Sequence, residues 1–309
     1  LFIGQKFPAT ERVQSGVSFG GMCKATFLRP FFWVMFICMG ITASLELGPN
    51  RWIPAILQAG GMPGILVLVY ITGLMAVLRQ FAGSIVHRLS PPGLLFISAI
   101  LGGLGLYWLS FAESLGMAIA AATVFALGVC FFWPTMLGVV SERIPKGGAL
   151  ALAMMGGIGM LASGMIASPM IGSAADTYLK GKLPKAGTTA VLQEVATVFP
   201  KLQAEAEGNL GEDLQPGIDA ANAVLEKIKA NPAGELPHPD TANALRAAIS
   251  SGIDAEVVGK AAGILNPADN YGGRMSFRLI APFAIILAVV FGVMYLGDKR
   301  KGGYKAEEI

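Results

Sequence analysis

The stretch GVCFFWPTMLGVVSERIP, from Gly128 to Pro145, decides the class of this chain. It is an apolar run of membrane length, and Trp133-Pro134 interrupts it. Glu142, Arg143 and a second proline close it. Proline and clustered aromatic side chains inside such a run are typical of a membrane helix beside a cavity, because neighbouring helices can satisfy the backbone groups that proline frees.

The composition favours the same class over the whole chain. Hydrophobic residues make up 54% of 309 positions, charged residues make up 14%, and the mean hydropathy is +0.61. Soluble domains carry about 25% charged residues. The sequence therefore predicts an all-α membrane protein that crosses the bilayer several times. Cys23, Cys38 and Cys130 show neither a disulfide framework nor a metal-ligand spacing.

Apolar runs of about 20 residues are long enough to span the hydrocarbon. Six segments qualify, so we predict a six-helix bundle. They are Pro30–Ser44 with a weak continuation to Leu57, Pro63–Val86, Pro91–Ala112, Leu115–Val140, Gly147–Ala175 and Leu279–Leu296.

Basic residues in short loops predict the orientation, since Lys and Arg accumulate on the cytoplasmic side. They occur before the first span and after the second, fourth and sixth: Lys6, Arg12, Lys24, Arg29, Arg88, Arg143, Lys146, Lys299, Arg300, Lys301 and Lys305. The short loops on the other side carry only Arg51, and the long polar segment between the fifth and sixth spans is not counted, because long domains translocate largely regardless of charge. We therefore expect both termini in the cytoplasm and a location in the plasma (inner) membrane.

A polar insertion separates the fifth span from the sixth. Residues 177–273 hold 12 of the 20 acidic residues, and their apolar positions recur every three or four residues. This pattern predicts an extracytoplasmic helical subdomain. The expected organisation is a connector at 1–29, five spans within 30–176, the insertion at 177–273, the sixth span at 274–297 and a tail at 298–309.

The first residues, Leu1–Gly4, are apolar and run directly into a basic stretch without the three regions of a signal peptide. We interpret them as the cytoplasmic end of a preceding helix, so the chain is expected to be a fragment.

Several of these stretches together resemble a known family. They are the connector GQKFPATERVQSGVSF, the first-span ending ELGPNRWIP, and the GVCFFWPTMLGVVSERIP helix with ALAMMGGIGMLASGMI after it. With the six spans, they resemble the C-terminal half of a major facilitator superfamily transporter, nearest to the sugar-permease-like members related to fucose permease. The resemblance covers residues 1–176 and 275–300 and leaves out the insertion.

A loop signature of that family, G-x-x-x-D-R, aligns with Gly83 to Arg88. Here His87 replaces the family's aspartate. The resemblance implies that Arg88 pairs with helix ends at a cytoplasmic gate, although the acidic partner within the loop is missing. Glu142 and Arg143 are further gate candidates.

The resemblance also implies a mechanism. Two six-helix halves would rock around a site at the midplane of the bilayer, which is alternating access. The expected partners are the lipid bilayer, a small polar solute such as a sugar, a proton or other cation, and the missing N-terminal six-helix half. We expect no cofactor and no nucleic-acid partner.

Glu46 is the strongest candidate for chemistry, because an ionisable group at membrane depth usually faces a cavity or a partner. It could bind a polar solute or couple protons, with Arg51 tuning its ionisation. Alternatively, Glu46 and Arg51 form an interfacial pair while Trp52 lies in the aromatic belt. Asn50 belongs to the same group.

Arg79 and Gln80 near the end of the second span leave two possibilities. Arg79 either donates hydrogen bonds to a solute in the cavity or extends its charged end to the headgroups. Phe132 and Trp133 in the fourth span could stack on a sugar ring, while Pro134 frees a backbone carbonyl as a ligand or hinge. Packing or lipid contact is the alternative for these aromatic residues.

Other motifs have simpler interpretations. The glycines of residues 102–105 and 156–159 are expected to allow close helix packing. His238 has no companion ligand for a metal. The sequence carries no catalytic constellation and no Walker A motif, so we do not expect an enzyme. A secondary transporter is the leading prediction. The alternative is a membrane-anchored binding or scaffold protein that acts through the insertion.

Overall fold

The structure is a computed structural model that describes residues 16–179, 181–205 and 210–307. Within these ranges, the side chains of residues 84–87, 205, 210–213 and 238 are not described. The predicted end of a preceding helix at Leu1–Gly4 lies outside these residues.

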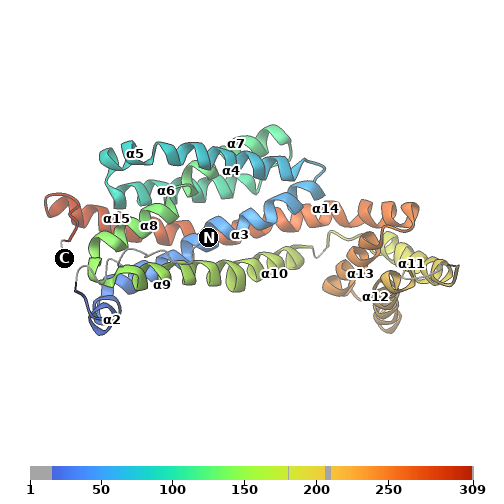
Figure 1. The fold of residues 1–309 in the computed structure, drawn as a ribbon. Coiled ribbons are helices and arrows are strands. Elements are labelled where there is room, and N and C mark those ends of the chain that lie inside the picture. Colours follow the sequence, from blue (N-terminus) through green and yellow to red (C-terminus); the bar gives the residue numbers. More distant parts are fainter. Residues whose placement is uncertain (1–15, 180, 206–209, 308–309) are drawn as a thin grey trace, which may run out of the picture. The chain divides into compact units, whose positions relative to one another are not determined.

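Every regular element in the described ranges is helical, which confirms the all-α class (Figure 1). The α-helices are α2 (Phe19–Phe27), α3 (Pro30–Ala59), α4 (Gly64–Gln80), α5 (Ala82–Leu89), α6 (Pro91–Leu109), α7 (Leu115–Val129), α8 (Phe132–Arg143), α9 (Gly148–Leu161), α10 (Ser168–Tyr178), α11 (Lys185–Glu205), α12 (Leu210–Ala230), α13 (His238–Ser251), α14 (Ala255–Ile280) and α15 (Phe283–Arg300). A short 3₁₀-helix, η1 (Pro145–Gly147), precedes α9, and a π-helical turn, η2 (Ala162–Ala167), follows it.

Five helical stretches among the described residues are long and apolar enough to cross a membrane. They are Pro30–Ala59, Pro91–Leu109, Leu115–Arg143, Pro145–Tyr178 and Ala255–Arg300. This is the make-up of an all-α membrane protein. The predicted second span, Pro63–Val86, is divided between α4, an apolar helix of 17 residues, and α5.

The break in the fourth predicted span lies earlier than the sequence indicates. α7 ends at Val129 and α8 begins at Phe132, so Pro134 is the third residue of the new helix. Proline fits in the first turn of a helix, because an N–H at that position has no acceptor within the same helix. The prediction that Trp133-Pro134 is itself the break is therefore wrong; the break is at Cys130 and Phe131.

The chain divides into two compact units. The described residues of the first are 16–51, 66–169 and 280–307, and α6 packs there against both α7 and α15. A Cβ added at Gly128 would lie 2.0 Å from the Gly102 nitrogen, and one at Gly103 would lie 2.4 Å from the Ala284 Cβ. These contacts require glycine, as predicted for residues 102–105.

In the second glycine run, residues 156–159, only one glycine lies in tight contact with a neighbouring helix. A Cβ at Gly159 would lie 2.7 Å from the Trp133 ring, whereas Gly156 and Gly157 have nothing within 4 Å. A Cβ added at Gly40 would lie at ordinary contact distances, 3.4 Å from the Ala162 Cβ and 3.6 Å from the Ile158 side chain, so α3 lies beside α9 and η2 there.

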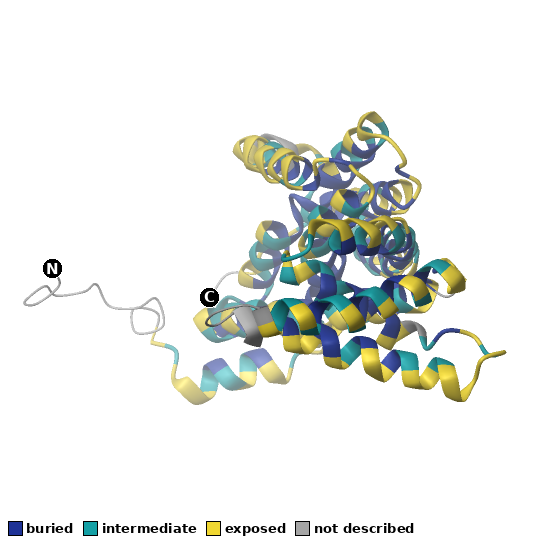
Figure 2. Cartoon of the chain, turned by 90° about the vertical axis from the view of Figure 1, so that its right-hand side faces the viewer, coloured by how far each residue is buried: buried dark blue, intermediate teal, exposed yellow. Residues whose placement is uncertain are grey.

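Large apolar side chains are exposed on the outside of the first unit, as a lipid-facing surface requires. They include Leu66, Val69, Met165, Ile285, Val289 and Val293, each at 60% or more. Buried and exposed residues alternate along the helices in Figure 2.

The second unit comprises residues 52–65 and 170–279, a wider range than the predicted insertion. α12 packs against α11 and α13. These three helices lie together in Figure 1. With α14 they bury an apolar core of their own that includes Leu192, Phe199, Leu245 and Leu265.

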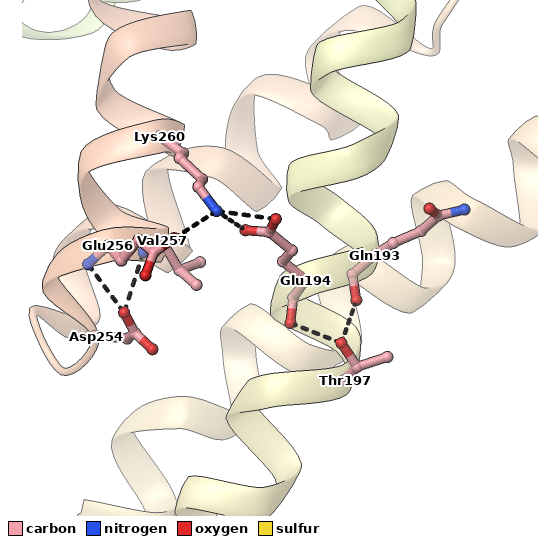
Figure 3. Close-up of polar contacts among 7 residues, drawn as sticks. All are labelled: Gln193, Glu194, Thr197, Asp254, Glu256, Val257 and Lys260. Carbon is pink, nitrogen blue, oxygen red and sulfur yellow. Dashed lines mark hydrogen bonds and ion pairs between the residues drawn. The ribbon is translucent and has the colours of Figure 1, made fainter.

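Polar contacts fix the start of α14 in this unit (Figure 3). The Asp254 carboxylate accepts from the backbone N–H groups of Glu256 and Val257 at 2.9 and 3.1 Å, as a helix N-cap does. Lys260 then joins α14 to α11 through Glu194 at 3.0 Å, and it also pairs with Glu256 at 2.9 Å.

Candidate functional site

A buried carboxylate lies inside the first unit. Glu46 on α3 is 3% exposed, and its Oε1 lies 3.7 Å from Nη2 of Arg79 on α4. This separation permits an ion pair but exceeds a normal hydrogen bond. In the described part of the chain, Glu46 Oε2 is buried and has no hydrogen-bond partner. The carboxylate is therefore paired in charge but incompletely satisfied.

Arg79 is held in place by a backbone carbonyl. Its Nε donates to the Cys130 oxygen at 2.9 Å. In a regular helix that oxygen would accept from the N–H of residue 134, which is a proline here. The carbonyl that Pro134 frees thus positions the guanidinium beside Glu46.

Further buried polar atoms in the first unit lack hydrogen-bond partners among the described residues. They include Asn50 Oδ1, Trp133 Nε1, Ser163 Oγ and Ser168 Oγ. Asn50 follows Glu46 by one helical turn on α3, and Ser163 lies in the π-helical turn η2. Buried polar atoms are normally paired, and π-helical turns are frequent at functional sites. The interior of this helix bundle therefore offers unused donors and acceptors.

The remaining predicted residues in this unit have other roles. The structure pairs Glu46 with Arg79, so the predicted partner Arg51 is wrong; Arg51 is exposed. Gln80 is also exposed. Phe132 is fully buried, and the Trp133 ring packs on Gly159. Packing therefore accounts for Phe132 and for most of Trp133.

Trp52 belongs to the second unit, where it lines a pocket with Asp176, Arg246 and Asp269. The sequence grouped it with Glu46 because of their spacing on α3.

A cluster of charged residues surrounds the end of α8 in the first unit. Arg143 Nη2 contacts Asp298 Oδ2 at 2.5 Å. The Arg143 guanidinium also lies over the Tyr304 ring, 4.9 Å from its centroid. Tyr304 donates to Glu142 at 2.6 Å, and Arg29 binds both the Arg143 carbonyl and Glu307. The C-terminal tail is therefore docked against the two predicted gate residues, Glu142 and Arg143.

Burial raises the pKa of the Tyr304 hydroxyl, and the hydrogen bond to Glu142 raises it further. The neutral hydroxyl is thereby favoured as the donor to the Glu142 carboxylate.

Arg88 opens onto the same region. It lines a cleft of 610 Å³ together with Glu142, Asp298, Lys299 and Tyr304. Arg88 and Gly83 lie on the short helix α5, and both are exposed. The side chain of His87 lies outside the described residues. Arg88 thus shares a cleft with the Glu142 and Asp298 carboxylates.

Sequence reasoning missed several residues of these clusters. Asp298 directly precedes the basic residues Lys299 to Lys301, which indicate only the orientation of the chain in the membrane. Tyr304 and Glu307 belong to a short polar tail without a recognisable motif. Asp176 and Arg246 are 70 residues apart and carry no local signal. No group of three or more metal-binding side chains occurs among the described residues.

Comparison with protein-family models, with curated proteins and with solved structures finds no match to this chain.

Proposed function

We propose that the chain belongs to a secondary transporter that moves a small polar solute, such as a sugar, by alternating access. In this proposal it lies in the plasma (inner) membrane with both termini in the cytoplasm, and Glu46 and Arg79 form the polar centre of the solute path. A second six-helix half completes the path.

One observation carries the proposal: a buried carboxylate that is charge-paired but incompletely hydrogen-bonded inside a bundle of apolar helices. Ionisable groups at membrane depth are costly, and they usually mark a solute or ion pathway. A solute hydroxyl, or a proton, would supply the donor that Glu46 Oε2 lacks. Arg79 would offer its remaining N–H groups to an acceptor on the same solute.

In this proposal, the weak Glu46–Arg79 contact couples proton binding to solute binding. At 3.7 Å the pair has charge attraction without a hydrogen bond, so a proton on Glu46 would release Arg79 at a small cost. Arg79 would remain on the Cys130 carbonyl. Protonation and solute binding would thus compete for one carboxylate.

The docked tail supports a gate at the end of α8. Arg143, Asp298, Glu142 and Tyr304 form a connected set of polar contacts between two segments distant in sequence, the end of α8 and the stretch from Asp298 to Tyr304. Forming and breaking these contacts would switch the helix ends between two arrangements, as alternating access requires.

Uptake of radiolabelled neutral monosaccharides by cells that express the whole transporter, this chain together with its second six-helix half, tests the proposal. Glu46→Gln removes the charge and preserves the shape, and we expect it to reduce uptake at least about tenfold, the effect of about 1.4 kcal/mol. Glu235→Gln, at an exposed position of the second unit, is the matched control and should leave uptake unchanged. Equal uptake by both variants would refute the role of Glu46.

A membrane-anchored binding or scaffold protein is the second candidate, because the second unit has an apolar core of its own. Deletion of residues 177–273 separates the two. A transporter should retain at least part of its uptake, whereas a scaffold should lose every function while the remaining helices still insert.

A further inference from the structure

The second unit contains a pocket that the proposed transport path does not use. It has a volume of 310 Å³, near the lower end of the range of about 300–1,000 Å³ for small-molecule sites. Its polar lining is Asp176, Arg246 and Asp269, and its apolar lining includes Trp52, Ala55 and Ile56.

Arg246 uses most of its donors inside the protein. Its Nη2 binds Asp176 at 3.1 Å and Asp269 at 2.6 Å, its Nε reaches Asp269 at 3.4 Å, and its Nη1 reaches Asn243 at 3.3 Å. Guanidinium has five N–H donors, so little capacity remains for an anionic ligand. Burial alone would lower the pKa of Arg246, but the bonds to Asp269 and Asp176 outweigh it and raise the pKa. The guanidinium is therefore a fixed internal cation.

The charges that line the pocket do not balance. Asp176 and Asp269 carry two negative charges against the single positive charge of Arg246. Asp176 engages Arg246 through Oδ1, and its side chain is 34% exposed. Its second carboxylate oxygen is thus available to a donor, and the net negative charge favours a cationic one.

Trp52 supplies the aromatic wall. A Cβ at Gly172 would lie 3.3 Å from the Trp52 ring, so glycine allows this close approach of α10 to the indole. Asn270 Nδ2 donates to the Ile56 carbonyl at 2.7 Å, which ties the end of α3 to α14 within this unit. The wall is therefore held in place before any ligand enters.

Aromatic rings attract cations, and indole does so most strongly. We propose that this pocket binds a small organic cation, a primary or quaternary ammonium compound, with its charge at Asp176 and its apolar part against Trp52. A neutral polyol would gain nothing from the charge imbalance, and an anion would be repelled by it.

Titration of the purified full chain in detergent with tetramethylammonium chloride and with ethylammonium chloride tests the proposal. The readouts are intrinsic tryptophan fluorescence and heat of binding, with sodium chloride at equal ionic strength and glucose as reference solutes. We expect saturable binding of at least one ammonium salt and none of the reference solutes.

Two variants locate the site. Asp176→Asn should weaken ammonium binding at least about tenfold, as the loss of a charge-assisted contact does. Trp52→Phe should abolish the fluorescence change while the heat of binding persists, since phenylalanine still offers a ring. Asp240→Asn, at an exposed ion pair with Lys227, is the control and should bind as the parent chain does.

Three results would overturn the proposal. They are no saturable binding of either ammonium salt by the parent chain, equal binding of glucose, or unchanged affinity in a folded Asp176→Asn chain. If Asp176→Asn does not fold, the titrations of the parent chain and of Trp52→Phe test the proposal instead. A fluorescence change that persists in Trp52→Phe would show that the ligand binds away from Trp52 and would contradict the proposal. None of these measurements depends on transport. A failed uptake assay therefore leaves the pocket proposal unaffected, and a failure of ammonium binding leaves the transport proposal unaffected.

Discussion

Arg79 donates a 2.9 Å hydrogen bond from Nε to the backbone oxygen of Cys130, an oxygen that Pro134 deprives of its helical donor. The contact joins α4 to the break between α7 and α8. It also aims the guanidinium of Arg79 at Glu46, because Nε is fixed while Nη2 stays free to approach the carboxylate.

Arg79→Lys keeps the positive charge but removes the planar pair of donors that serve Cys130 and Glu46 together. We expect uptake to fall by about tenfold with expression retained. Arg79→Ala leaves a buried carboxylate uncompensated, which typically costs about 3–5 kcal/mol, so its melting temperature in detergent should fall as well. Full uptake by the lysine variant would show that charge alone is sufficient.

Pro134→Ala restores an N–H that competes with Arg79 for the Cys130 oxygen. We expect the helix to become more continuous and the Arg79 contact to weaken, so that uptake falls while thermal stability holds or rises. Measuring uptake and thermal stability together distinguishes a positioning role of Pro134 from a packing role. If the proline were merely structural, its replacement would change uptake and stability in the same direction. Ala120→Gly on α7 provides a control for altered helix flexibility.

Gly128→Ala should destabilise the first unit, because the added Cβ would meet the backbone of Gly102 at 2.0 Å. Forced repacking usually costs about 1–3 kcal/mol. Gly138→Ala on α8 is the matched control, with nothing within 4 Å, and should stabilise its helix by roughly 0.5–1 kcal/mol. Thermal unfolding in detergent measures both; equal melting temperatures would argue against the tight α6–α7 contact.

Tyr304 should ionise at a higher pH than a free tyrosine side chain. Its pKa is raised from 10.0 by burial and by donation to Glu142, so its contribution to tail docking is complete below pH 10.0 and disappears only as the pH passes the raised value. The difference in tyrosinate absorbance between the parent chain and Tyr304→Phe measures this titration. A difference curve centred near pH 10.0 would indicate an undocked tail.

The apolar runs made the helices predictable, because span length and hydropathy are local properties. The position of the break in the fourth span was harder to predict from the sequence. A proline in the first turn of a new helix looks the same in sequence as a proline that kinks an old one, and only the tertiary partner of the Cys130 oxygen separates the two.

The candidate sites were predictable only in their residue types. Glu46 stood out because a carboxylate in an apolar run is rare. Its partner Arg79 did not, because sequence spacing favoured the nearer Arg51. The pocket around Arg246 had no local signal at all, since its carboxylates come from α10 and α14.

The central claim is that the Glu46–Arg79 centre lies on a path that opens to each side of the membrane in turn. Asn50→Cys, with Cys23, Cys38 and Cys130 replaced by alanine, tests it directly, because Asn50 lies one turn from Glu46 and its buried Oδ1 has no hydrogen-bond partner among the described residues. The account predicts reaction with a membrane-impermeant thiol reagent from either face in separate experiments. Reaction from neither face, or from one face only, would contradict it.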